Sequence, residues 1–172
     1  MTTTSLRPVA AVSEADVEAL GLRVCSTYVV NGRAVGTETF AEKLHFLDMV
    51  AARAAELRDR DVVLGGDFNV APADEDVYDP AAFAGATHVT PDERSRLAAI
   101  LDAGGLVDAY AAVPTGAHRF TWWDYRAGHF HKNLGLRIDL LLVSESLAGR
   151  LRSCGIDRDM RKGPKPSDHA PL

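Results

Sequence analysis

The sequence has few cysteines and no long hydrophobic run. Its two cysteines, Cys25 and Cys154, lack the spacing of metal ligands, so both are expected to be reduced and buried. No apolar run approaches the roughly 20 residues that span a bilayer, and the first residues do not resemble a secretory leader. These absences exclude a disulfide scaffold and favour a single globular domain, with no membrane partner and the cytoplasm as the default compartment.

Charge is unevenly distributed along the 172 residues, which carry a formal net charge of −5. Residues 115–172 hold ten Lys and Arg against six Asp and Glu, or +4, whereas residues 1–114 hold nine against eighteen, or −9. The overall charge argues against a general nucleic-acid coat. A basic C-terminal third is typical of a local polyanion-binding surface, although a solvated face would give the same pattern.

The most informative stretch runs from Val62 to Pro72 and reads VVLGGDFNVAP. Its apolar start and the glycine pair after it predict a strand that is buried on both faces and ends in a tight turn. Asp67 and Asn69 follow, and alternate side chains of an extended backbone share a face. Such a pair can hold a water or a phosphate oxygen near a metal, and a turn cap is the structural alternative.

Other patterns predict a mixture of strands and helices. Leu22–Val30 and Leu136–Ser144 are expected to be strands, the second with Asp139 inside an apolar run, where a charge needs a partner. Helical spacing predicts a helix from Thr39, as its cap, to about Arg58, and another from Pro91 to about Ala103. These elements indicate the α/β (α+β) fold class.

Three further segments are less regular. Ser13–Leu20 is interpreted as a capped helical turn or a polar linker, and Phe120–Trp123 as strand-like. Ala73–Pro91 is expected to be a solvated acidic connection, with a metal-binding loop as the alternative.

Several polar positions lie at predicted strand ends or in a proline-bounded loop: Tyr28, Asp67, Asn69, Asp139, Asp168 and His169. Each alone has a structural explanation. Together they provide carboxylates for a hard cation, an imidazole oriented by a carboxylate, and an amide and a phenol for phosphate oxygens. The combination predicts phosphodiester hydrolysis.

The segments GGDFNVAP, FTWWDYR, GLRIDLLL and KPSDHAP, in this order, resemble the exodeoxyribonuclease III group of the endonuclease/exonuclease/phosphatase superfamily. The resemblance runs from about Arg23 to Leu172. It implies a four-layer α/β-sandwich, of which this chain would form mainly the C-terminal half. It also implies a DNA-repair phosphodiesterase that acts as a 3′–5′ exonuclease on duplex DNA and as an abasic-site endonuclease.

The resemblance implies catalytic roles for five residues. Asp67 would activate the attacking water or protonate the leaving oxygen, and Asn69 would hold the water or the phosphate. Asp139 would orient His169, which would stabilise the pentacovalent phosphate, and Tyr28 would touch the phosphate. A cofactor, Mg²⁺ or Mn²⁺, is implied as well, with ligands drawn from this set and the loop beside it: Asp168, His169, Asp67 and Asn69.

DNA contacts are implied for residues around this site. A slot for an extrahelical abasic sugar would be lined by Trp122, Leu136 and Ile138, with core packing as the alternative. Asn31 is expected near the DNA backbone, together with five basic residues: Arg119, Arg126, Arg137, Arg161 and Lys165.

The sequence departs from the family pattern at its start. The family's first strand with a metal-side Asn, and its QE motif with a magnesium-ligand Glu, are not found before residue 22. We therefore expect residues 1–21 to be a remnant or linker, residues 22–172 to form a partial domain, and activity to be impaired. The alternatives are a non-catalytic half-domain that binds DNA or a partner, through self-association or a complementing half, and a superfamily phosphatase acting on small phosphoesters.

Overall fold

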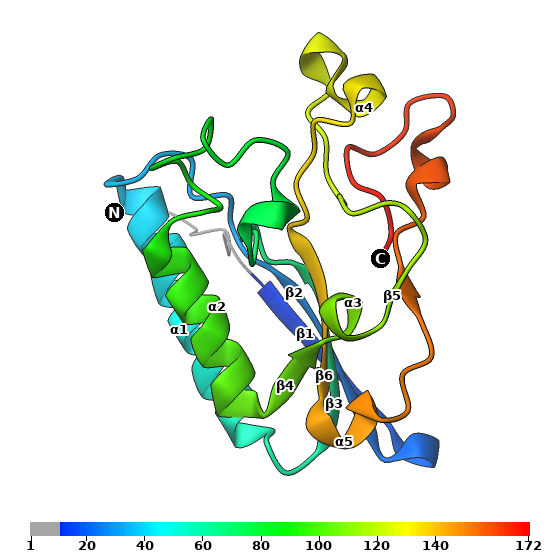
Figure 1. Ribbon diagram of the computed structural model, residues 1–172. Coiled ribbons are helices and arrows are strands. Elements are labelled where there is room, and N and C mark those ends of the chain that lie inside the picture. Colours follow the sequence, from blue (N-terminus) through cyan, green and yellow to red (C-terminus); the bar gives the residue numbers. More distant parts are fainter. Residues whose placement is uncertain (1–10) are drawn as a thin grey trace, which may run out of the picture.

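The structure is a computed structural model that describes residues 11–172. A five-stranded sheet with the order β1-β2-β3-β6-β4 forms its centre (Figure 1). Strands β2 and β3 are parallel, and the other neighbours in the sheet are antiparallel. The strands of this sheet have the following bounds: β1 Ala11–Val17, β2 Leu22–Tyr28, β3 Asp61–Asp67, β4 Leu106–Asp108 and β6 Asp139–Ser144. The mixed α/β class is confirmed.

Two long helices, α1 (Glu38–Glu56) and α2 (Pro91–Gly104), lie side by side on one face of the sheet (Figure 1). The predicted bounds of α2 are confirmed within a residue, and the Thr90–Glu93 capping box explains why it starts there. The predicted cap of α1 is wrong. Thr37, and not Thr39, accepts the hydrogen bond from the Phe40 backbone, because the helix begins at Glu38 and its cap lies two residues before the predicted one.

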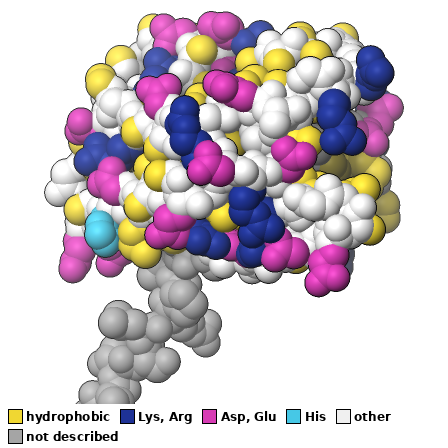
Figure 2. All heavy atoms as spheres, turned by 90° about the horizontal axis from the view of Figure 1, so that it is seen from below, with side chains coloured by type: hydrophobic (Ala, Val, Ile, Leu, Met, Phe, Trp, Pro, Cys, Tyr) yellow, Lys and Arg dark blue, Asp and Glu magenta, His cyan; other side chains and the backbone are white. Residues whose placement is uncertain are grey.

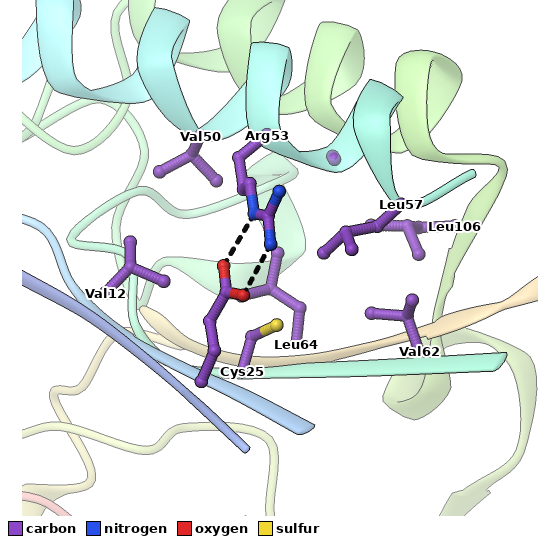
Figure 3. Close-up of a pocket in the computed structure, with 10 residues that line it drawn as sticks. Val12, Cys25, Val50, Arg53, Leu57, Val62, Leu64 and Leu106 are labelled. Carbon is purple, nitrogen blue, oxygen red and sulfur yellow. Dashed lines mark hydrogen bonds and ion pairs between the residues drawn. The ribbon is translucent and has the colours of Figure 1, made fainter. Parts of the chain in front are cut away.

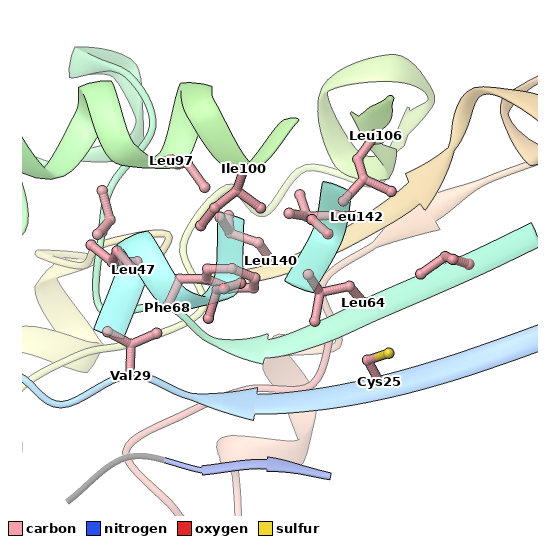
Figure 4. Packing of buried hydrophobic residues seen from close by; sticks show 14 of the residues in the cluster. Cys25, Val29, Leu47, Leu64, Phe68, Leu97, Ile100, Leu106, Leu140 and Leu142 are labelled. Atoms are coloured by element: carbon pink, nitrogen blue, oxygen red, sulfur yellow. The ribbon is translucent and has the colours of Figure 1, made fainter. Parts of the chain in front are cut away.

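The main core fills the space between these helices and the sheet (Figure 4). Leu47 of α1 and Ile100 of α2 are fully buried there, as are Phe68 and Leu142 from the sheet side. Burying such side chains contributes about 1.5–3 kcal/mol each to folding, so this layer fixes the position of β3 and β6. The site described below is built at the ends of these two strands.

The C-terminal part of the chain covers a portion of the opposite face of the sheet (Figure 1). Its short elements pack around Trp123, Val143 and Ile156 in a second apolar cluster. These elements and the remaining short turns are α3 Ala109–Ala112, β5 Pro114–Thr115, η3 Arg126–Gly128, α4 His129–Lys132, α5 Glu145–Ala148, β7 Cys154–Gly155 and η4 Arg158–Arg161, with η1 Glu18–Leu20 and η2 Asp74–Asp76 elsewhere.

The structure corrects two interpretations of irregular segments. Within Ser13–Leu20, residues up to Val17 belong to β1, whose register on β2 makes it the edge strand, and only η1 is helical. Residues 1–10 of the segment interpreted as a remnant or linker lie outside the described part. Phe120–Trp123 is not a strand, since Trp122 makes only isolated bridges, to Leu136 and His169.

A cavity of about 20 Å³ between α1 and the sheet has room for about one water, and the Arg53–Glu14 ion pair lies beside it (Figure 3). At the end of the molecule seen in Figure 2, acidic and basic side chains are interspersed. Within residues 11–172, no helix is both long and apolar enough to cross a membrane.

Candidate active site

The site forms where three neighbouring strands meet at one edge of the sheet. Asp67 ends β3 and is paired in register with Tyr28, the last residue of β2, and with Asp139, the first residue of β6. Gly66 permits this arrangement, because its φ is +142° and a Cβ would lie 1.9 Å from the Thr27 carbonyl oxygen. The predicted gathering of these side chains at one rim is therefore explained by strand register.

Asn69 holds both carboxylate oxygens of Asp67. Its backbone N–H donates to Asp67 Oδ1 at 2.8 Å, and its Nδ2 donates to Asp67 Oδ2 at 2.9 Å and to the Val29 carbonyl at 2.8 Å. Asn69 is 4% exposed and adopts a left-handed backbone with φ +52°, which Asn tolerates better than most residues. The carboxylate of Asp67 is thus fixed in orientation before any substrate arrives.

His169 comes from the far end of the chain and is oriented by Asp139. Its Nδ1 lies 2.8 Å from Asp139 Oδ2, so this carboxylate has the partner that its place in an apolar strand required. The buried Thr121 joins the two segments, because its Oγ1 accepts from the Asp139 backbone N–H and its carbonyl accepts from the Ala170 N–H. Sequence spacing alone gave Thr121 no role.

Asp67 and His169 face each other across a short gap. His169 Nε2 lies 4.0 Å from Asp67 Oδ2, longer than a hydrogen bond. Burial and the nearby Asp139 charge raise the pKa of Asp67 to about 6. Burial would lower the pKa of His169, but the Asp139 hydrogen bond and the surrounding carboxylates outweigh it and raise that pKa above its usual value. The site thus holds a weakly acidic carboxyl and an imidazole that protonates readily.

Asp168 stands beside this pair and is held by Trp122. The Trp122 indole N–H donates to Asp168 Oδ2 at 3.0 Å, and the Asp168 carbonyl accepts from the Trp123 N–H. The four residues predicted as metal ligands do not form a preformed cage. The Asn69 amide oxygen faces Asn31, His169 Nδ1 faces Asp139, and no group of three or more His, Cys, Asp or Glu in residues 11–172 is arranged to hold a metal. In this arrangement Asp168, His169, Asp67 and Asn69 do not form the metal-ligand set that was predicted for them.

A buried polar cluster supports the site from behind. Lys43 and Glu93 are both 0% exposed and form an ion pair, to which Thr87 also donates. Burial lowers the pKa of Lys43, whereas the Lys43 charge and several hydrogen bonds keep the pKa of Glu93 below its usual value against the effect of burial. Lys43 donates to the Asn69 carbonyl at 2.7 Å, so the cluster reaches the site directly.

The sequence contained one signal for this cluster. Lys43 lies on the same helical stripe as Phe40 and Leu47, where a charged residue is unexpected. Leu44, the next residue along the helix, is only partly buried.

Two of the predicted DNA-contacting arginines are buried, and those predictions are wrong. Arg137 is 2% exposed and its guanidinium is held by Asp76 and Asp108, so it cannot reach a phosphate. Asp76, which was expected in a solvated connection, is itself fully buried by this pair. Arg161 is 5% exposed and donates to the Ser167 and Trp123 carbonyls, so it braces the loop before His169.

Two of the three residues predicted to line the sugar slot are also buried. Leu136 and Ile138 are 0% and 2% exposed and lie in a small apolar cluster, against which the partly exposed Trp122 packs. The burial of Leu136 and Ile138 favours core packing, the alternative given for them. The predicted contacts that remain accessible in whole or part are Asn31, Trp122, Arg119, Arg126 and Lys165, with Arg119 paired to Asp76 and Arg126 to Asp124.

Comparison with known proteins agrees with this geometry. The Endonuclease/Exonuclease/phosphatase family matches residues 4–169. The chain belongs to this family. It is 38% identical over 118 residues to exodeoxyribonuclease III of Haemophilus influenzae, covering 64% of this chain and 44% of that protein. It is 32% identical over 151 residues to an exodeoxyribonuclease of Bacillus subtilis, covering 87% of this chain and 58% of that protein. The chain is thus an exodeoxyribonuclease III-type family member that spans about half the length of these relatives.

Solved structures share the fold. A 3′ phosphatase from Neisseria, bound to a product DNA hairpin, superposes with a TM-score of 0.86 at 37% identity, over 92% of this chain and 62% of that one. An AP endonuclease from Archaeoglobus fulgidus gives a TM-score of 0.81 at 32% identity, over 87% of this chain and 59% of that one. The predicted fold class of the endonuclease/exonuclease/phosphatase type is confirmed.

Proposed function

We propose that this chain carries the water-activating and phosphate-stabilising groups of a DNA-repair phosphodiesterase that acts on duplex DNA as a 3′–5′ exonuclease and at abasic sites as an endonuclease. One observation carries the proposal. Asp67, held by Asn69, and His169, held by Asp139, face each other across 4.0 Å at one rim. The names of the relatives, exodeoxyribonucleases and AP endonucleases, support the choice of substrate.

The chemistry follows from the protonation of the two groups. Asp67, with its pKa raised to about 6, is ionised at neutral pH and basic enough to take a proton from a water beside the phosphorus. His169, with its pKa raised, is protonated more readily than an ordinary histidine, and its Nε2–H would face the charge that develops on a phosphate oxygen. Tyr28, half exposed at the same rim, would contact the phosphate. We also propose dependence on Mg²⁺ or Mn²⁺, which the family resemblance implies and which the described residues alone do not provide with a complete set of ligands.

The test uses the full chain with two labelled duplexes, one carrying an abasic site and one with a recessed 3′ end, in the presence of Mg²⁺. We expect cleavage of both, lowered by about 10²–10⁴-fold in Asp67→Asn and in His169→Ala. Asp102→Asn and His45→Ala, on exposed helix positions, are the matched controls and should leave the rate unchanged. Cleavage by wild type that both site variants retain, or turnover of a small phosphoester with no cleavage of DNA, would contradict the proposal.

A second candidate, a DNA- or partner-binding half-domain without catalysis, is favoured by two observations. The donors at the rim do not complete a metal cage within the described residues, and an open hollow of about 470 Å³ lies beside His169, lined in part by Gly65 and Leu141. This candidate predicts DNA binding with no cleavage by a folded preparation, and self-association in sedimentation equilibrium. Cleavage by a monodisperse monomer excludes it.

A further inference from the structure

The backbone conformation of Asn69 decides whether Asp67 can be held. The N–H and the side-chain amide of Asn69 reach the two oxygens of Asp67 together because its φ is +52°. A non-glycine residue in this region is strained, by roughly 1–2 kcal/mol for most side chains and less for Asn. Contacts elsewhere must therefore hold this peptide in place, and they determine how well the carboxylate is oriented.

Two side chains converge on the carbonyl oxygen of Asn69 from the protein interior. Lys43 Nζ lies 2.7 Å from it, and His88 Nδ1 also lies 2.7 Å from it. Both side chains are buried, at 0% and 7% exposed residue area. A carbonyl only accepts hydrogen bonds, so His88 must carry its proton on Nδ1.

The other ring nitrogen of His88 closes a loop of hydrogen bonds around the site. His88 Nε2 lies 3.3 Å from Asn31 Nδ2, which also reaches Asn69 Oδ1 at 3.4 Å. The Arg33 backbone N–H donates to Asn31 Oδ1 and so fixes which end of that amide faces the ring. The His88 ring therefore contacts the Asn69 carbonyl directly, and it is linked to the Asn69 side chain through Asn31.

A contribution to the stability of the fold explains why Lys43 is buried here, but it does not explain His88. Lys43 is the ion-pair partner of the buried Glu93, so its removal would cost stability whatever the site does. The ring of His88 hydrogen-bonds to no charged side chain in the described residues, and only its backbone N–H donates to Glu93. The backbone of His88 is left-handed with φ +81°, where glycine or asparagine would fit with less strain. What a histidine adds at this strained position is the contact of its ring with Asn69 and Asn31.

From this arrangement we infer that His88 is a positioning residue for the reaction: as the Nδ1–H tautomer it holds the Asn69 peptide, and through Asn69 it orients Asp67. The inference rests on the proposed function. It assigns His88 no contact with substrate, since the ring lies behind Asn69 and Asn31.

The matched pair of variants is His88→Asn and His88→Gly. Both tolerate the left-handed backbone, but only asparagine keeps an N–H donor where Nδ1 stands. On the duplex substrates, we expect His88→Gly to lower kcat about tenfold with KM unchanged, as one lost buried hydrogen bond would do. His88→Asn should stay within about threefold of wild type, and the exposed His45→Asn should match wild type. Equal kcat for the glycine and asparagine variants would overturn the inference.

Two further measurements need no catalysis. In ¹⁵N–¹H spectra at neutral pH, His88 should carry its proton on Nδ1. Amide exchange at Asn69 should be about tenfold faster in His88→Gly than in wild type and near wild type in His88→Asn, with exchange at the core strand residues Leu64 and Leu142 unchanged. If DNA is not cleaved but these results hold, the proposed function fails and the positioning contact stands. If His88 is protonated on Nε2 alone, or if Asn69 exchange does not change, the inference fails even in an active enzyme.

Discussion

Two buried cations near the active edge of the sheet, Lys43 and Arg137, differ in what their hydrogen bonds reach. Lys43 pairs with Glu93 and also donates to the backbone carbonyls of Asn69 and Asn31. Arg137 donates to the carboxylates of Asp76 and Asp108. The first cluster therefore holds the backbone of the site, whereas the second fastens the acidic loop to the start of β6. Burial of a charge near a site is thus not in itself a sign of a role in the chemistry.

The largest effect is expected from Lys43→Met, which leaves the carboxylate of Glu93 buried without its partner. Removing one member of a buried pair costs about 3–5 kcal/mol, and here it also removes a donor to Asn69. Urea unfolding should show this loss, and activity at a temperature where the variant is folded should still fall. The double variant Lys43→Met/Glu93→Leu should recover much of the stability. If it recovers full activity as well, the link between this cluster and the site is wrong.

Arg137→Met should cost less, about 2–3 kcal/mol, because Arg119 remains on Asp76 and Asp108 is partly exposed. The kcat of the folded variant should stay within about threefold of wild type, since the guanidinium of Arg137 donates to Asp76 and Asp108, neither of which belongs to the site. Unfolding curves and kcat measured on the same preparation check both parts. A loss of kcat as large as that of Lys43→Met would remove the distinction between the two cations.

The pH dependence of stability should separate Asp67 from both clusters. Its pKa is about 6 in the folded protein against 3.8 for an ordinary Asp, so the folded state binds more protons between these values. Stability from this group is therefore present at low pH and lost as pH rises through about 6. Asp67→Asn should be more stable than wild type at pH 8 by up to about 2–3 kcal/mol, at 1.36 kcal/mol per pKa unit, and close to it at pH 4.

The smallest effects are expected at exposed basic residues. If the chain binds duplex DNA as proposed, Arg126→Gln and Lys165→Gln should each lower affinity severalfold and reduce the slope of log K against log salt by about 0.9. Arg137→Met should leave that slope unchanged, because the buried guanidinium reaches no phosphate. Fluorescence anisotropy at four salt concentrations gives the slopes. A reduced slope for Arg137→Met would mean that this residue is accessible in solution.

Much of the fold followed from local patterns. Strands β2 and β3 and helix α2 were predictable because alternation, glycine pairs and a capping box act over a few residues. The edge strand β1 was missed, since its sequence is polar and its strand conformation depends on pairing with β2. Fixed motifs also indicated the polar residues Asp67, Asp139 and His169, which the structure brings together at one rim.

Local sequence patterns could not predict which charged residues are buried. Arg137 and Arg161 were assigned to DNA from the family resemblance, and the structure gives each of them internal partners far away in sequence. His88 had no local signal at all. Its role depends on Asn69 and Asn31, 19 and 57 residues away, which meet it only after β2 and β3 pair.

The sequence by itself determined which chemical groups this protein has to offer, because a carboxylate, an amide and an imidazole keep their chemistry wherever they lie. It also determined the strands that carry Asp67 and Asp139, through hydrophobic patterns of short range. Only the tertiary structure decided which charges are accessible, which are paired, and that His169 meets Asp67 across 4.0 Å. Electrostatics and hydrogen bonding act between neighbours in space, and those neighbours exist only once the chain has folded.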